Sequence, residues 1–394
     1  MTSPRGTGVA RIWTSLILPC LALSCEAQAQ IWPRSDAEEL LHVAEQVGAD
    51  GLDPADYDVK ALRADVARGD AGSWSGRATA MFLHLAGDFS NGHLRDRRAV
   101  AWHIAGPELD DAAARALLAE ALANRQVGRV LARLPPQHRQ YRSLKAALAV
   151  TPARDKAAIE RLRANLERWR WMPRELGSRY LLVNVPAFTV SLVEGGRVVE
   201  RRRVIVGKRA TPTPQFAAKI SGLVVNPWWD VPPSIVRESV GQLLRAHPAQ
   251  ARARGFVSVG GRVRQAPGPG NALGLVKLVM PNPFRVYLHD TPTKQLFDEE
   301  VRAFSHGCIR VQDALGLAAS LLARTPGWTP ARIDQAVAGR ATAQVGLATP
   351  LPVYIAYFTA AVEEDGGIAT FPDVYGRDGP VVASLVDRQL DTTP

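Results

Sequence analysis

The residues best suited to chemistry lie close to a single cysteine. Cys308 follows a glycine and stands two places after His306, while a second histidine, His289, lies earlier in the same region. A cysteine reacts as its thiolate, which requires a neighbouring base or positive charge. Either histidine could be that base, since His306 and Cys308 would share one face of an extended segment. Gly307 lets the backbone bend, which could turn amide N–H groups toward a developing oxyanion. The pattern indicates nucleophilic thiol chemistry.

The N-terminus predicts an exported protein with one remaining thiol. A positively charged start precedes the apolar run Ile12–Leu23, which is too short to span a bilayer, and an A-x-A sequence follows. This predicts a signal peptide over residues 1–29, whose cleavage removes Cys20 and Cys25. A leftover thiol in an oxidising compartment has no disulfide partner and is expected to be reactive. Lipidation at Cys25, or a buried N-terminal helix, is the alternative reading of this segment.

The cysteine segment resembles the L,D-transpeptidase (YkuD-type) catalytic domain. That family has a histidine, a spacer, then Ser/Thr-His-Gly-Cys, a hydrophobic residue, and Asn or Arg; here His289 precedes SHGCIR at residues 305–310. The resemblance implies that Cys308 is the nucleophile and His289 the general base. It also implies that the carbonyl of Asp290 orients His289, and that amides of Gly307 and Cys308 form the oxyanion hole. The expected substrate contacts are Arg310, His306, Ser305, Tyr287, Trp228 and Trp229.

The implied reaction is ping-pong acyl transfer on peptidoglycan. Stem peptides would be both acyl donor and acceptor, joined in 3→3 cross-links through a cysteine thioester, with no metal or cofactor. Carbapenem-type β-lactams would be covalent inhibitors. The location would be the periplasm, in association with the cell wall, and the role would lie in cell-wall biogenesis and cell shape.

Two other function classes stay open. The same fold could pass the acyl group to water, to a free amino acid or to a protein, as an L,D-carboxypeptidase or an exchange or attachment enzyme. Alternatively, the protein could bind the wall without catalysis. A zinc site made from His289, His306 and Cys308 is disfavoured, because no fourth ligand recurs at metal-site spacing. The histidines of the N-terminal half, His84, His93 and His103, are expected to be ordinary surface or core residues.

The elements around these residues predict an α+β multidomain fold. Apolar residues recur at helical spacing in the N-terminal part, whereas β-rich runs flank Gly195-Gly196, which is a hairpin signal. Several short strands with Gly and Pro turns favour a β-sandwich or barrel. We expect a helical scaffold domain at 33–168, a mainly-β catalytic domain at 177–345 with an inserted capping segment at 231–270, and a C-terminal extension at 346–394.

The flanks extend the resemblance to the large, multidomain L,D-transpeptidase subfamily. Matching motifs include NLERWRWMP at 165–173, NPWWDVPPS at 226–234 and PGPGNALG at 267–274. The small peptidoglycan-binding module usual in that subfamily is not found between the scaffold and catalytic motifs.

The capping segment is basic and is expected to be a mobile lid. It opens on Pro232-Pro233, closes on the Pro/Gly loop at 267–270, and carries six arginines against one acid, Glu238. The whole chain has a formal net charge of +10, which suits an acidic partner. No zinc-finger or RNA-binding signature supports nucleic acid.

Overall fold

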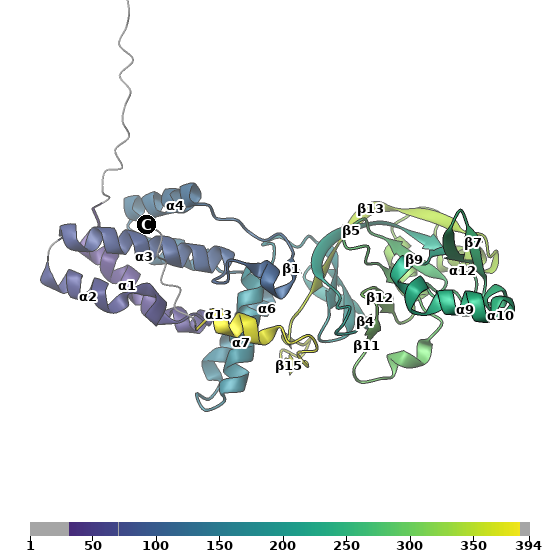
Figure 1. Cartoon of the computed structure of the whole chain (residues 1–394). Helices are drawn as coiled ribbons and strands as arrows, with labels where there is room; N and C mark the ends of the chain where they lie inside the picture. Colours follow the sequence, from purple (N-terminus) through teal and green to yellow (C-terminus); the bar gives the residue numbers. More distant parts are fainter. Residues whose placement is uncertain (1–30, 70, 387–394) are drawn as a thin grey trace, which may run out of the picture.

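The computed structural model describes residues 31–69 and 71–386, so the predicted signal peptide lies outside the described residues. The predicted α+β fold is confirmed, with helices at one end and a mainly-β part at the other (Figure 1). Asp110 and Asp155 cap the helices that follow them by accepting from Ala113 N and Ala158 N. The helices of the N-terminal part are α1 (Arg34–Gln46), α2 (Val59–Arg68), α3 (Ala71–Asn91), α4 (Asp111–Asn124), α5 (Val127–Ala132), α6 (Arg139–Val150) and α7 (Lys156–Arg170).

A 10-stranded sheet forms the catalytic part. Its main path runs β1-β5-β13-β2-β3-β4-β12-β10-β9, and β5 also pairs with β9, so the path closes on itself like a barrel. The sequence left sandwich and barrel open, and this pairing settles the choice. The strands are β1 (Trp102–His103), β2 (Arg179–Asn184), β3 (Thr189–Glu194), β4 (Arg197–Gly207), β5 (Gln215–Val225), β9 (Val276–Val279), β10 (Leu288–His289), β11 (Ala303–Ser305), β12 (Ile309–Val311) and β13 (Ala343–Ala356).

The hairpin predicted at Gly195-Gly196 is confirmed. Both glycines have positive φ, 55° and 78°, and they join β3 to β4. Positive φ is costly for other residues, which explains why the turn carries glycine.

The boundary expected at residue 345 is wrong. β13 spans it, pairing parallel to β2 and antiparallel to β5, with Val353 beside both Leu181 and Ala218. The first part of the expected C-terminal extension therefore belongs to the middle of the sheet. This strand is hard to recognise from the sequence, because Pro350 and Pro352 lie inside it. The other domain boundaries stay predictions.

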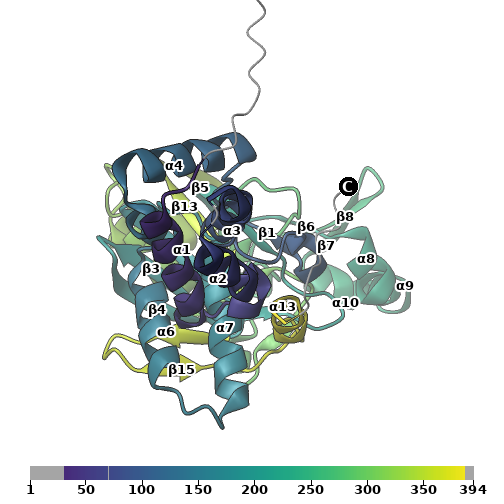
Figure 2. The ribbon, with the colours of Figure 1, turned by 90° about the vertical axis from the view of Figure 1, so that its left-hand side faces the viewer.

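The segment 231–270 forms a small unit with its own core, here called the lid. Helices fill its first part, and the β7–β8 hairpin, which the sequence did not predict, fills its second part. A separate hydrophobic cluster holds the lid together, built on Val231, Val240, Ala251 and Phe256. Figure 2 shows the lid projecting to one side of the sheet. Its elements are β6 (Trp229–Asp230), α8 (Pro233–Ile235), the π-helix η4 (Val236–Val240), α9 (Gly241–Ala246), α10 (Pro248–Ala253), β7 (Phe256–Val259) and β8 (Arg262–Gln265).

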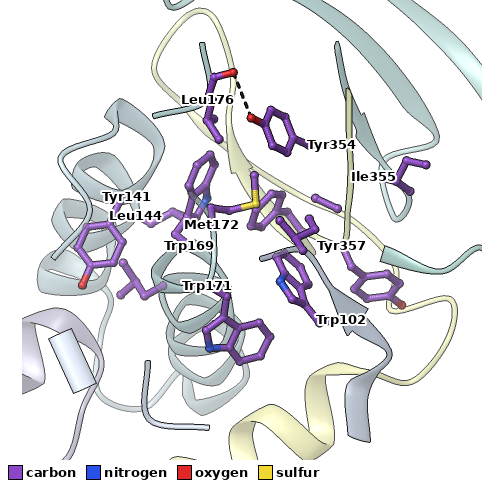
Figure 3. Packing of buried hydrophobic residues seen from close by; sticks show 14 of the residues in the cluster. Trp102, Tyr141, Leu144, Trp169, Trp171, Met172, Leu176, Tyr354, Ile355 and Tyr357 are labelled. Atoms are coloured by element: carbon purple, nitrogen blue, oxygen red, sulfur yellow. Dashed lines mark hydrogen bonds between the residues drawn. The ribbon is translucent and has the colours of Figure 1, made fainter. Parts of the chain in front are cut away.

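The two parts meet along α7 and the segment after β13. Figure 3 shows the aromatic packing at this junction, where Trp169 stacks on Phe358 with ring centroids 4.8 Å apart. The fully buried Asn165 side chain bonds both ways to Thr359, donating to Oγ1 at 2.8 Å and accepting from its N–H at 2.9 Å. The remaining elements are α11 (Ala314–Leu322), α12 (Pro330–Ala338), β14 (Ala360–Val362), β15 (Ile368–Thr370) and α13 (Asp378–Ser384). Within the described ranges, no helix has the length and apolar character needed to cross a bilayer.

Replacing Asn165 should weaken the junction. Asn165→Ala leaves the buried Thr359 N–H without its acceptor, which should cost roughly 2–4 kcal/mol of unfolding free energy. Asn124→Ala is the matched control, because that exposed side chain bonds only a carbonyl on its own helix. Urea unfolding measures both variants. Equal losses would show that the Asn165–Thr359 bonds add nothing to stability.

Candidate active site

The register of three short strands collects the predicted residues on one face. His289 pairs with Lys277 of β9 on one side and with Arg310 of β12 on the other. Directly paired residues point to the same face of a sheet, as do residues two apart on one strand. Lys277, His289 and Arg310 therefore form a row, and Cys308, two places before Arg310, shares their face.

The Cys308 thiol lies among partly buried groups. Its Sγ is 3.9 Å from the carbonyl oxygen of Arg285. Burial raises the pKa of the thiol, while a backbone hydrogen bond from Tyr287 and the charges of Lys277 and Arg310 oppose that rise. The net shift keeps the free enzyme in its thiol form at neutral pH. Activation thus depends on removal of a proton when substrate arrives.

His289 is held as a neutral base. The side chain is 5% exposed, and its Nδ1 donates to the carbonyl oxygen of Asp290 at 2.5 Å. Burial lowers the pKa of His289 to about 4, against a smaller raising effect of that hydrogen bond. With the proton on Nδ1, the lone pair is on Nε2, which can accept a proton. The Asp290 carboxylate is fixed separately by Leu275 N–H and Lys294.

Ser305 braces the turn that carries the cysteine. Its Oγ donates to the carbonyl oxygen of Cys308 at 2.5 Å and accepts from the N–H of Gly307 at 3.0 Å. Gly307 has φ of 110°, a conformation that favours glycine. The Gly307 amide expected in the oxyanion hole donates to Ser305 in this structure, so its use on a substrate stays a prediction that requires this bond to open. The Cys308 N–H has no acceptor among the described residues, and it remains the candidate donor.

His306 does not lie on an extended segment, contrary to the premise for treating it as a rival base. The chain bends at His306 and Gly307 between β11 and β12. The ring is directed to the lid, where Nε2 lies 2.7 Å from Oε2 of Glu238. Glu238 also meets Lys208 Nζ at 3.3 Å. These two bonds join Glu238 of the lid to the catalytic part.

The two tryptophans separate in the structure. Trp229 is partly buried and packs against the lid core near Phe256. Trp228 is 37% exposed, with the guanidinium of Arg264 4.8 Å above its ring. Trp228 is thus the more accessible of the two, and the substrate contacts expected of both stay predictions.

The expected hinge after the lid is tied down. Gln265 donates to the carbonyl oxygen of Gly270, and Asn271 donates to that of Pro227. The Asn271 side chain thus joins the segment that enters the lid to the segment that leaves it, and the Gln265 side chain fixes the loop at 267–270.

Two contributors escaped the sequence reasoning. Lys277 lies over the Tyr287 ring, with Nζ 3.6 Å from the centroid, and it borders the thiol. Thr213 is fully buried and donates from Oγ1 to the carbonyl oxygen of Gly307 at 2.9 Å. In the sequence, Lys277 lies between the apolar residues Val276 and Leu278, a pattern that could have marked it as facing away from the core. No local signal identifies Thr213.

Together these groups define a site for thiol chemistry: a protonated thiol, a neutral imidazole with a free acceptor, and two cations that stabilise negative charge. A cavity of about 380 Å³ elsewhere, between α6, α7 and β2–β4, is lined by none of the candidate residues.

Comparison with known proteins identifies the family. Residues 178–333 match the L,D-transpeptidase catalytic domain, and residues 27–148 match a scaffold domain. A Haemophilus influenzae protein described as "Putative L,D-transpeptidase" is 30% identical over 293 residues, which cover 68% of this chain and 59% of that protein. The chain thus spans less than two thirds of that relative. The chain therefore contains an L,D-transpeptidase catalytic domain and a scaffold domain.

Solved structures give weaker likenesses. The L,D-transpeptidase of Mycobacterium smegmatis is 15% identical, over 45% of this chain and 58% of that chain, with a TM-score of 0.24. An Enterococcus faecium L,D-transpeptidase is also 15% identical, over 45% and 50% of the two chains, with a TM-score of 0.21. These scores are too low to support a conclusion about this chain.

Lys277 should tune the thiol. Lys277→Met removes one of the two cations that favour the thiolate, so the pKa of Cys308 should rise further and alkylation at pH 7 should slow. The rate of iodoacetamide labelling against pH measures this shift. Lys219→Met, on an exposed position of β5, is the control. A labelling profile that matches the wild type would remove Lys277 from the site.

Glu238 should hold the lid against the catalytic part. Glu238→Gln weakens the contacts to His306 and Lys208, so amide exchange over residues 236–246 should become a few-fold faster; exposed ion pairs are weak, which limits the effect. Glu299→Gln, an exposed acid outside the lid, is the control. Unchanged exchange over those residues would show that the lid is held by its stems alone.

Proposed function

We propose that this protein is an exported L,D-transpeptidase that forms 3→3 peptidoglycan cross-links through a thioester on Cys308. The observation that carries the proposal is the shared face of Cys308 and His289 on paired strands inside a domain of this family. Peptidoglycan stem peptides would be donor and acceptor, and the periplasm would be the site of action.

The proposed first half-reaction transfers an acyl group to sulfur. His289 Nε2 takes the proton of the Cys308 thiol as Sγ attacks the carbonyl carbon of the third stem residue. The Cys308 N–H is placed to stabilise the oxyanion, and Lys277 and Arg310 offset the negative charge. The C–N bond then breaks, and His289 returns its proton to the leaving D-alanine amine.

The second half-reaction restores the thiol. The side-chain amine of a diamino acid on a second stem attacks the thioester carbon, with His289 accepting a proton from that amine. The C–S bond breaks, and Sγ is reprotonated. Arg310, whose Nη1 bonds Thr293, is suited to a stem carboxylate, and the exposed face of Trp228 offers a contact for the stem.

The product experiment decides among the acceptors. Purified protein is incubated with tetrapeptide muropeptides, and products are identified by mass spectrometry. The proposal expects 3→3 dimers. Tripeptides alone would indicate transfer to water, and exchanged termini would indicate transfer to free amino acids. An absence of products, with Cys308 intact, would favour a noncatalytic wall-binding protein.

Variants test the two central roles. Cys308→Ala should abolish turnover, and His289→Ala should lower it by about 10²–10⁴-fold, the usual loss for a general base. His306→Ala should lose less, because that ring contacts Glu238. The imidazole must be neutral, so the rate should fall as pH drops through about 4, the pKa of His289. A larger loss in His306→Ala with the fold intact would exchange the two roles.

A stable carbapenem adduct, seen by intact mass and absent from Cys308→Ala, would support the acyl-enzyme.

A further inference from the structure

A second group of reactive side chains lies in the scaffold domain. His84 and Asp88 are one helical turn apart on α3, so they share a face. The helix ends at Asn91, and Gly92, with φ of 86°, turns the chain back so that His93 lies beside Asp88. A Cβ on Gly92 would come within 2.5 Å of Trp171 Nε1, so only glycine fits this return.

The three side chains converge closely enough to share an ion. Their ligand atoms all lie within 4.8 Å of one another. His93 Nδ1 is 2.8 Å from Asp88 Oδ2, and His84 Nε2 is 3.4 Å from the same oxygen. With metal–ligand bonds of about 2.0–2.2 Å, neighbouring ligands of a tetrahedral zinc ion stand roughly 3.3–3.5 Å apart. The 3.4 Å spacing already fits, and the 2.8 Å spacing must open by a few tenths of an ångström. The two histidine nitrogens, which lie within 4.8 Å of one another, must approach by up to about 1.3 Å.

The polar bonds of this cluster leave one ring nitrogen unsatisfied. Asp88 is fully buried; Arg95 donates to its Oδ1 and Tyr57 donates to its Oδ2. His93 is 6% exposed, yet its Nε2 is buried without a partner among the described residues. A buried, unpaired imidazole nitrogen is costly. The cost at Nε2 is separate from the ion, because the ring faces Asp88 through Nδ1 and would bind the ion there.

The cluster has an opening and a suitable charge. The His84 side chain is 38% exposed, so an ion could enter past it. Asp56 is half-buried and near enough that His93 and His84 act on its charge. Two carboxylates against the single guanidinium of Arg95 leave a net negative charge when the histidines are neutral.

We propose that His84, Asp88 and His93 form a structural site for a divalent transition metal of the zinc class, with Asp56 or water as the fourth ligand. Mixed imidazole and carboxylate donors are suited to such ions. The ion would fix the segment after α3 against the junction with the catalytic part. That segment is already tied there, because Leu94 N–H and Trp171 Nε1 both donate to Glu167 Oε1. This revises the sequence expectation of ordinary histidines and of no metal.

The test uses the whole chain in a Cys308→Ala background, so that the thiol of Cys308 does not compete for the metal. Metal-free protein is titrated with Zn²⁺ by calorimetry and with Co²⁺ by absorption, and bound metal is counted by mass spectrometry. We expect one equivalent, a tetrahedral Co²⁺ spectrum and a higher melting temperature.

His84→Ala is the main variant, because its partly exposed ring is the least needed for folding. It should weaken Zn²⁺ binding by more than about 100-fold, a loss at least as large as those of outer-shell changes. His42→Ala, an exposed scaffold histidine, is the control and should bind normally. Asp56→Asn distinguishes a carboxylate from water as fourth ligand. Lack of stoichiometric binding, or equal affinity in His84→Ala, would overturn the proposal.

Discussion

The position of the thiol depends on how two very short strands pair. β10 has two residues and β12 three, too few to fix their own register. A slip by one residue would reverse every side chain between the two faces. Leu288 and Ile309 prevent it, because both are fully buried in the core and hold the alternate positions, on the face opposite His289 and Arg310. Backbone bonds from Ile309 N–H to Tyr287 and from Asp290 N–H to Val276 add to the same alignment.

A second set of contacts links the scaffold to the turn that carries the cysteine. Arg168 of α7 donates to the carbonyl oxygen of Arg377, whose guanidinium lies over the Tyr375 ring. The Tyr375 hydroxyl donates to the carbonyl oxygen of Gly207, and Thr213 joins Gly207 to Gly307. The C-terminal segment thus connects a buried helix of one part to the catalytic turn of the other.

The sequence predicted best what is local in the chain. Gly195-Gly196 indicated a hairpin because two positive φ angles are a local requirement. The motif around Cys308 was equally visible.

What the sequence could not give is set by contacts between distant segments. Lys277 reaches the site only because β9 pairs with β10, and Glu238 meets His306 only because the lid folds back. The Gly307 amide seemed free until Ser305 was seen to accept from it. His84 and His93 look unrelated in the sequence, because it is the turn at Gly92 that brings them together in the fold. Burial and pairing across the fold decide all of these, and no local pattern records them.

The place of β13 has a consequence for how the chain matures. It follows every other strand of the closed path in sequence, yet it fills the gap between β2 and β5. Until it emerges during synthesis, both neighbours have open edges that can pair with other chains. Pairings between distant segments also form slowly. The chain therefore has its greatest need of protection from aggregation just before β13 is made, when the thiol segment is already present but the closed path is not.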